Sequence, residues 1–387
     1  MTDFRLACAG AVLAAMTVAG GARAASYTDL HDFNGTDGAR PIYQPVLGPH
    51  GTLYGTTFAG GPDDAGTVYK LSGGQLTTLI TGAQPEPAPV VDGDGNIYLS
   101  FVSGGAHGYG SIGRWDPVNG LTTLYSFTGG ADGWSPNSLT VAADGTIYGT
   151  SGLGGNVAGI CASTGCGTAF KLSPNGKLKI LHTFNGRDGA GPETTLLRVG
   201  HTLFGATLQG ATGVAGADAG SVFSISDAGK SFKTYAIPSA PGTTYNFEGS
   251  LVQDSAGNLW GTAVENSAGY GAIYKIDTTG NFSVAYVFQA AADGAFPECD
   301  LEIDGNDVVY GTTHGNDTYN EGAGPGGWGT VFAYDTKSGV LTTLHAFSKA
   351  DGANPIGGVT TDPAGNVYGV TEFGGANDLG VVYRIAP

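Results

Sequence analysis

The feature that most constrains the fold is a stretch of sequence that recurs seven times along the chain. Each copy contains an apolar segment ending in Phe, usually an Asp-Gly turn and a Pro, then a G-[TN]-[LIV]-Y-G-T segment, a Gly-rich loop and a G-[TSV]-V-[YF]-[KR]-[LI] segment. The intervals between equivalent aromatic residues, 44 to 58 residues, fit one structural unit with loops of different lengths. Those aromatic residues are Tyr54, Tyr98, Tyr148, Phe204, Trp260, Tyr310 and Tyr368.

Each copy is expected to form four short antiparallel strands. In the first copy these are residues 46–47, 52–58, 67–71 and 76–80, with tight Gly-containing turns between strands. A four-stranded sheet of this size cannot bury both of its faces alone, whereas radial stacking of similar sheets buries them all. The sequence therefore predicts an all-β fold, a seven-bladed β-propeller with four-stranded antiparallel blades.

The two ends of the chain are out of phase with the repeat. Residues 27–33 (YTDLHDF) match the fourth strand of other copies, such as residues 341–347 (LTTLHAF), while the chain ends on a third strand, residues 381–385. We therefore expect residues 27–33 to pair antiparallel with residues 381–385 and close the ring. An open solenoid would need distinct capping repeats, and the sequence contains none. Residues 26–387 are expected to form one domain.

The first 24 residues have the features of a secretory signal peptide. Arg5 precedes an apolar stretch over residues 6–19, and Ala22-Arg23-Ala24 is a small-x-small cleavage site. The apolar stretch is shorter than the roughly 20 residues that a transmembrane helix needs. We expect cleavage after Ala24, export through the Sec pathway, no transmembrane span, and an extracellular or periplasmic location.

Charge and cysteine content limit the partners and the redox state. The net charge is −17 and the basic residues are scattered, which excludes nucleic acid and anionic lipid as expected partners and leaves polysaccharide, cations or another envelope protein. A monomer is expected.

The four cysteines are expected to be in different states. Cys8 lies in the signal segment, Cys161 and Cys166 are expected to form a disulfide in an oxidising compartment, and Cys299 is expected to be a buried, unpaired thiol. Metal ligation by Cys161 and Cys166 is the alternative, but no His or second thiol pair is nearby in the sequence.

The repeat resembles a known family. Tyr54-Gly55-Thr56-Thr57 with residues 66–71 (GTVYKL), and Tyr310-Gly311-Thr312-Thr313 with residues 329–332 (GTVF), are similar to the GloVer (Gloeo_Verruco) tandem repeat, and the resemblance covers nearly all of the chain. It implies an exported propeller-like protein, often with a C-terminal sorting anchor, and no established activity. Because the sequence ends just after a third strand, at Pro387, we expect release or periplasmic residence rather than surface attachment.

The best candidate site lies where the inner strands begin. The residue after the recurring Pro opens each inner strand near one mouth of the central channel, and three consecutive copies place a glutamate there. Converging carboxylates could bind calcium, or one of them could have a raised pKa suited to acid catalysis; the alternative is that this position is solvated and simply tolerates Glu. The seven residues are Ile42, Glu86, Asn137, Glu193, Glu248, Glu298 and Ile356.

Other candidates lie in the loops on the same face, which carry the largest insertions. Trp134, Phe296 and Trp328 could stack on sugar rings, and His314 is a further candidate binding residue. By contrast, the Asp residues of the Asp-Gly turns (Asp37, Asp132, Asp188, Asp293 and Asp351) are expected to be structural, and the D-G-D-G-N sequence at 92–96 is expected to be a hairpin rather than a calcium loop.

No catalytic residue is assigned from the sequence. It contains no G-x-S-x-G, H-E-x-x-H, P-loop or dinucleotide fingerprint. The leading hypothesis is a non-enzymatic binding or interaction scaffold whose ligand is a carbohydrate, a cation or a protein at the loop-rich face. The alternative is a carbohydrate-active hydrolase or lyase that uses Glu193, Glu248 and Glu298. A purely structural role in the envelope is the third possibility.

Overall fold

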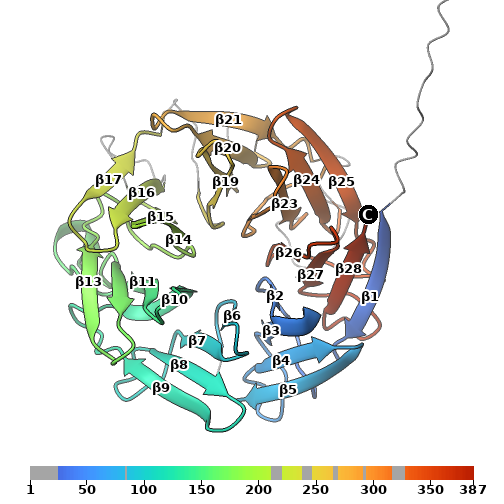
Figure 1. Cartoon of the computed structure of the whole chain (residues 1–387), viewed down its shortest axis with the longest axis horizontal. Coiled ribbons are helices and arrows are strands. Elements are labelled where there is room, and N and C mark those ends of the chain that lie inside the picture. The colour runs from blue at the N-terminus through green and yellow to red at the C-terminus, as the bar shows by residue number, and fades with distance from the viewer. Residues whose placement is uncertain are drawn as a thin grey trace, which may run out of the picture.

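A computed structural model describes residues 25–82, 85–210, 220–237, 246–264, 269–290, 293–315 and 327–387. The expected signal peptide, residues 1–24, lies outside these ranges, as do most of the two loop insertions that follow residues 210 and 315. The described residues form seven four-stranded antiparallel sheets arranged in a ring around a central channel (Figure 1). The predicted seven-bladed propeller is confirmed.

The strands of each blade follow one another outward from the channel (Figure 1). Blade 1 consists of β2 (Val46–Leu47), β3 (Leu53–Thr57), β4 (Thr67–Ser72) and β5 (Gln75–Thr81), and blade 2 of β6 (Val90–Val91), β7 (Ile97–Phe101), β8 (Ser111–Asp116) and β9 (Gly120–Ser126). Blade 3 consists of β10 (Trp134–Val141), β11 (Ile147–Leu153), β12 (Thr168–Leu172) and β13 (Leu178–Thr183), and blade 4 of β14 (Leu197–Val199), β15 (Thr202–Thr207), β16 (Ser221–Ser226) and β17 (Phe232–Tyr235).

The remaining blades have the same order. Blade 5 consists of β18 (Val252–Gln253), β19 (Leu259–Ala263), β20 (Ala272–Ile276) and β21 (Phe282–Val287), and blade 6 of β22 (Glu302–Ile303), β23 (Val308–Thr313), β24 (Thr330–Asp335) and β25 (Val340–Ala346). Blade 7 consists of β26 (Val359–Thr361), β27 (Val367–Thr371), β28 (Val381–Ala386) and, from the other end of the chain, β1 (Ser26–Asp32). The part of the chain that the structure describes has no helix long and apolar enough to cross a membrane.

The N-terminal strand closes the ring, as predicted. β1 pairs antiparallel with β28, with Tyr27 opposite Ile385 and Asp32 opposite Val381, and the two strands lie side by side at the outer edge of blade 7 (Figure 1). Phe33, which follows β1, is completely buried and packs in one cluster with Tyr69 of blade 1 and Val382 of blade 7. The closing strand therefore contributes both backbone pairing and core contacts between the first and last blades.

The glycine of the Y-G-T segment makes room for a buried aromatic side chain. Gly55 of β3 lies opposite Tyr69 of β4, and a Cβ atom at Gly55 would clash with the Tyr69 hydroxyl oxygen. Blades 3 to 7 have the same arrangement of a glycine opposite Tyr or Phe. Blade 2 reverses it, with Leu99 on β7 opposite Gly113 on β8. The exception keeps one large side chain and one glycine in each pair, so a steric rule accounts for all seven copies.

The Asp residues of the Asp-Gly turns have the expected structural role. Asp188 accepts hydrogen bonds from the backbone N–H of Asn185, at 2.9 Å, and pairs with the His182 ring, at 3.0 Å. His31 and His345 make the same contact in two other blades, and tyrosines replace the histidine in two more. The predicted hairpin at 92–96 also forms, because Asp92 accepts hydrogen bonds from the backbone N–H groups of Asp94 and Asn96.

The cysteines are arranged as predicted. Cys161 and Cys166 form a disulfide in the loop between β11 and β12, with Cα atoms 5.2 Å apart. Cys299 is a free thiol with 1% of its surface exposed, its sulfur accepts a hydrogen bond from the Thr312 N–H at 3.1 Å, and burial raises the pKa of its thiol to about 12. The thiolate, which is the reactive form, is therefore strongly disfavoured at neutral pH.

This arrangement predicts the alkylation pattern of protein that lacks residues 1–24. Iodoacetamide is expected to label no cysteine in the native protein, because Cys299 is buried and protonated, and one cysteine in denaturant without reductant. Mass spectrometry of the intact protein measures both numbers, and reduction in denaturant provides the control with three labels. Rapid labelling of native Cys299, or three labels without reductant, would contradict the structure.

Candidate functional site

A cavity of about 340 Å³ lies at the mouth of the channel where the inner strands begin, and we call it the mouth cavity. Each blade contributes the residue that was predicted to open its inner strand, and all seven of these residues line this one cavity: Ile42, Glu86, Asn137, Glu193, Glu248, Glu298 and Ile356. Val102, which follows β7, and Ser135 also line it, so the mouth cavity belongs to the face that carries the long loops. The structure therefore brings the three predicted glutamates together.

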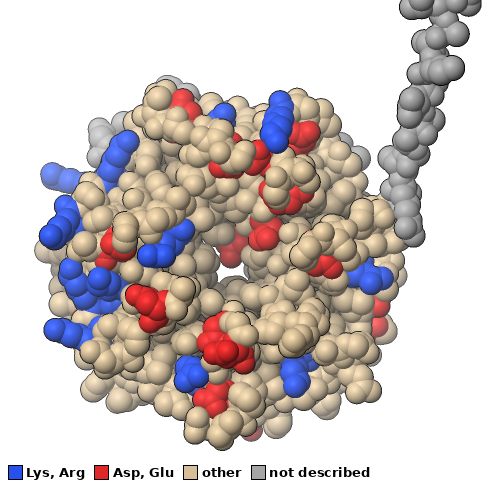
Figure 2. Space-filling view, in the orientation of Figure 1, with Lys and Arg blue, Asp and Glu red and all other residues tan. Residues whose placement is uncertain are grey.

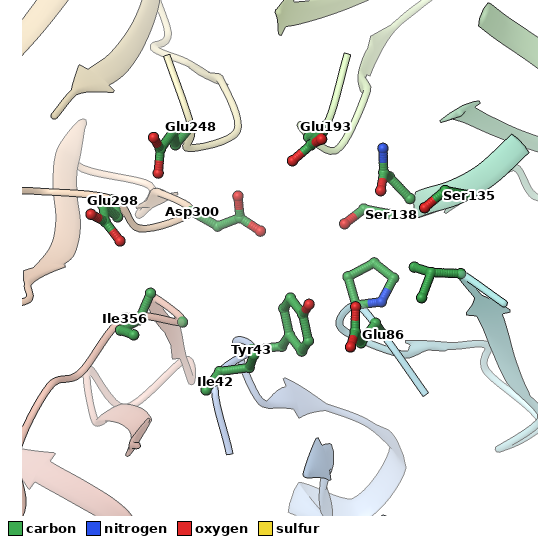
Figure 3. Close-up of a pocket in the computed structure, with 14 residues that line it drawn as sticks. Ile42, Tyr43, Glu86, Ser135, Ser138, Glu193, Glu248, Glu298, Asp300 and Ile356 are labelled. Atoms are coloured by element: carbon green, nitrogen blue, oxygen red, sulfur yellow. The ribbon is translucent and has the colours of Figure 1, made fainter. Parts of the chain in front are cut away.

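Tyr43 and Asp300 also line the mouth cavity, and neither was predicted from the sequence. Figure 3 shows Tyr43 of blade 1 and Asp300 of blade 6 projecting into the channel, with Glu86 beside Tyr43 and Glu193, Glu248 and Glu298 farther around the wall. The Tyr43 hydroxyl hydrogen-bonds to Glu86, and Asp300 accepts a hydrogen bond from the Ser250 backbone N–H at 2.8 Å. Asp300 could have been predicted from its spacing, because it lies two residues after Glu298 and the alternation of side chains along an extended strand places both on one face. Tyr43 follows Ile42 and gave no such signal.

The protein surroundings disfavour ionisation of several of these groups. Burial raises the pKa of Glu193 and of Glu86, although the hydrogen bond from Tyr43 partly offsets the shift at Glu86. Burial, together with the nearby carboxylates of Glu86 and Glu193, raises the pKa of Tyr43 well above its ordinary value. Tyr43 is therefore a hydrogen-bond donor throughout the physiological pH range, and the carboxyl groups of Glu86 and Glu193 keep their protons to a higher pH than exposed ones.

The mouth cavity combines carboxyl, hydroxyl and amide groups with a few apolar side chains. No Lys, Arg or His is among the described residues that line it. Figure 2 shows acidic side chains bordering the central opening on one face of the ring, while the Lys and Arg side chains in that view lie farther out. This charge distribution disfavours anionic ligands and leaves neutral polar or cationic ones.

The predicted loop residues are placed differently from the glutamates. Phe296 and His314 lie next to the mouth glutamate of blade 6: the His314 Nδ1 atom is 4.0 Å from the Glu298 carboxylate, and the two rings are 6.2 Å apart. Neither ring is among the described residues that line the mouth cavity. The structure therefore places them close to Glu298 but not among the residues that line the cavity.

The two predicted tryptophans are not part of the mouth cavity either. Trp134 was expected in a loop, but it is the first residue of β10, where it pairs with Leu153 and packs edge-to-face against Tyr109 with ring centroids 5.5 Å apart. The expectation was wrong because β10 begins two residues before Pro136. Its pairing with β11 therefore includes residues that were expected to belong to the loop after the Asp-Gly turn. Trp328 is half-buried, and the Lys349 amino group lies 5.4 Å from its ring centre.

Calcium coordination finds no support in the geometry. Within the described ranges, no group of three or more His, Cys, Asp or Glu side chains is placed to hold one metal ion. The glutamates surround the mouth cavity rather than converging on a point (Figure 3). A ligand that contacts several of them must therefore be larger than a bare ion.

Solved structures share the overall fold. The extracellular domain of a B. thetaiotaomicron protein described as a hybrid two-component system matches with a TM-score of 0.56 and 9% identity, over 93% of this chain and 39% of that one. PorZ, a surface component of the type-IX secretion system of Porphyromonas gingivalis, matches with a TM-score of 0.53 and 13% identity, over 89% of this chain and 46% of that one. This chain thus spans less than half the length of either protein, and identities this low show the fold alone.

A gluconolactonase from Xanthomonas campestris has a TM-score of 0.43 and 17% identity, over 74% of this chain and 85% of that one, and this likeness is too weak to bear on activity. No curated protein sequence matches the chain. The sequence profile of the Gloeobacter/Verrucomicrobia repeat matches four overlapping stretches, residues 10–156, 80–235, 158–323 and 217–387. These stretches extend from residue 10 to the end of the sequence, and the chain therefore belongs to the Gloeobacter/Verrucomicrobia repeat family.

Proposed function

We propose that this protein is an exported, non-enzymatic binding protein that holds a carbohydrate in the mouth cavity. The observation that carries the proposal is the convergence of seven equivalent inner-strand residues, four of them glutamates, on one cavity without a basic side chain among its described lining residues. Carboxylates accept hydrogen bonds from sugar hydroxyls, and the Asn137 amide and the serine hydroxyls add donors and acceptors. A volume of about 340 Å³ is in the range of small-molecule sites.

Export is part of the same proposal. The signal-like sequence of residues 1–24 directs the chain out of the cytoplasm and is removed after Ala24. A disulfide between Cys161 and Cys166 fits an oxidising compartment. In such a compartment the mouth cavity would be accessible to extracellular or periplasmic carbohydrate.

Replacing mouth glutamates by glutamine tests the site. A glycan array and immobilised polysaccharides identify the ligand, and isothermal titration calorimetry then measures Kd for Glu193→Gln, Glu248→Gln and Glu298→Gln. Loss of a charge-assisted hydrogen bond is expected to weaken binding roughly tenfold to a hundredfold per site. Asp63→Asn removes one exposed negative charge outside the channel and is expected to leave Kd unchanged, which controls for net charge.

Two outcomes would overturn the proposal. If all three variants keep the Kd of the wild type, the glutamates are solvated and do not form a site. If purified protein turns over a polysaccharide, and Glu193→Gln abolishes the turnover, the carbohydrate-active enzyme is the correct function. The raised pKa of Glu193 and Glu86 is what favours that second candidate, because a general acid must hold its proton near neutral pH.

A further inference from the structure

A second cavity, of about 260 Å³, lies deeper along the channel, and we call it the inner chamber. It shares Ser138 and Asp300 with the mouth cavity, so the two are adjacent along the channel. Its two walls differ in chemistry. Blades 1 to 3 supply an apolar wall that includes Val46, Val90 and Leu139, while blades 4 to 7 supply hydroxyl groups and the carboxyl groups of Asp300 and Glu302.

Glu302 occupies a position that every other blade fills without a charge. It is the inner-strand residue opposite the Y-G-T aromatic, Tyr310. The equivalent residues in the other six blades are Val46, Val90, Thr140, Leu197, Val252 and Thr360. A carboxyl group facing an apolar wall costs folding free energy unless something pairs with it, so the repeat architecture alone does not explain it.

Neither carboxyl of the inner chamber has a basic partner in the described structure. No Lys, Arg or His is among the described residues that line the chamber. Asp300 accepts a hydrogen bond from the Ser250 N–H, and the contact recorded for Glu302 is with the Thr361 hydroxyl at 3.5 Å, near the limit of a hydrogen bond. Burial raises the pKa of Glu302 to about 7 and also raises the pKa of Asp300.

We propose that the inner chamber binds an organic cation, an ammonium group that carries an apolar substituent. The ammonium would lie between Asp300 and Glu302, and the apolar part would pack against Val46, Val90 and Leu139. The site adjoins the mouth cavity and shares Asp300 and Ser138 with it, but the proposal does not depend on carbohydrate binding at the mouth. The bound ammonium would give Asp300 and Glu302 the counter-charge that the described residues lining the chamber do not supply.

Hexylammonium is a suitable probe, with 1-hexanol as a neutral ligand of the same size. Asp300 and Glu302 are the titratable groups among the described lining residues of the chamber, so they govern the pH dependence. Calorimetry is expected to detect hexylammonium binding that strengthens about tenfold from pH 6 to pH 8, because a carboxyl with a pKa near 7 becomes largely ionised over that interval. Binding of 1-hexanol is expected to be weaker and independent of pH.

Two variants of Glu302 separate ligand binding from folding. Glu302→Gln is expected to weaken hexylammonium binding at pH 8 at least tenfold and to abolish its pH dependence. Glu302→Val, which restores the residue of blades 1, 2 and 5, is expected to abolish binding and to raise Tm. Because folding raises the pKa of Glu302, the wild-type protein loses stability as pH rises through that pKa. The rise in Tm of Glu302→Val over the wild type should therefore be larger at pH 8 than at pH 5. Asp63→Asn again controls for net charge.

Three results would overturn the inference. The first is equal affinity for hexylammonium and 1-hexanol at pH 8. The second is a lower Tm for Glu302→Val, which would assign the carboxyl a structural role. The third is hexylammonium binding that survives Glu302→Gln but is lost in Glu193→Gln, which would place the cation at the mouth. Glycan binding is measured separately in every variant, so failure of the carbohydrate proposal would leave this test intact.

Discussion

Deletion of residues 26–33 is expected to destabilise the closed ring strongly. The deletion removes β1 from the edge of β28 and takes away the buried Phe33 between the first and last blades. Loss of one buried Phe side chain costs roughly 3–5 kcal/mol, and the exposed edge of β28 becomes a site for aggregation. Since whole domains are stable by only about 5–15 kcal/mol, Tm should fall by roughly 10 °C or more.

A circular permutant supplies the matched control. Ala386 lies opposite Ser26, so a Gly-Gly link between them, like the Gly73-Gly74 turn of blade 1, would join the two strands directly. New ends can be opened between Asn175 and Gly176, in the exposed turn before β13. This permutant retains β1 and is expected to melt near the wild-type temperature. Differential scanning calorimetry compares the three proteins, and an unchanged Tm for the deletion would show that β1 does not hold the ring closed.

Reversing the order of glycine and large side chain in one glycine–aromatic pair is expected to cause the second largest loss of stability. Gly55→Leu places side-chain atoms where the Tyr69 hydroxyl already lies, which should cost at least about 1–3 kcal/mol through overpacking. Tyr69→Gly leaves a void and should cost roughly 3–5 kcal/mol. The double variant reproduces the Leu99–Gly113 arrangement of blade 2, so it should be more stable than the sum of the single changes implies, by about 2 kcal/mol.

Denaturant unfolding of the four proteins in this cycle measures the coupling. Gly305→Ala is the control, because a Cβ atom there meets nothing within 4 Å. Strict additivity of Gly55→Leu and Tyr69→Gly would mean that the steric pairing does not explain why blade 2 differs from the others.

The fold was predictable because the sequence repeats. Seven copies of one pattern identify the unit, and the mismatch between residues 27–33 and the end of the chain identifies how the ring closes. The position of Glu193, Glu248 and Glu298 was predictable for the same reason, since equivalent residues in equivalent blades must lie at the same height along the channel. Periodicity thus predicts where a residue lies along the axis.

Periodicity does not predict what departs from it. Tyr43 reaches the channel although it directly follows Ile42, which also lines the mouth cavity. Trp134 joins β10 because that strand is longer than its counterparts in the other blades. Glu302 was not singled out from the sequence, because its significance depends on the burial that only the assembled ring creates.

The pairing of β1 with β28 also sets the order of events in folding. The last blade needs the first strand of the described chain and the last one, whose paired residues are 349 to 360 positions apart, so no partial chain can complete it. Closing so long a loop is entropically costly and slow, which favours a chain that stays open until its final strand has emerged. A polypeptide interrupted before Val381 leaves β1 without a partner, so premature termination yields an incomplete ring that proteases can recognise.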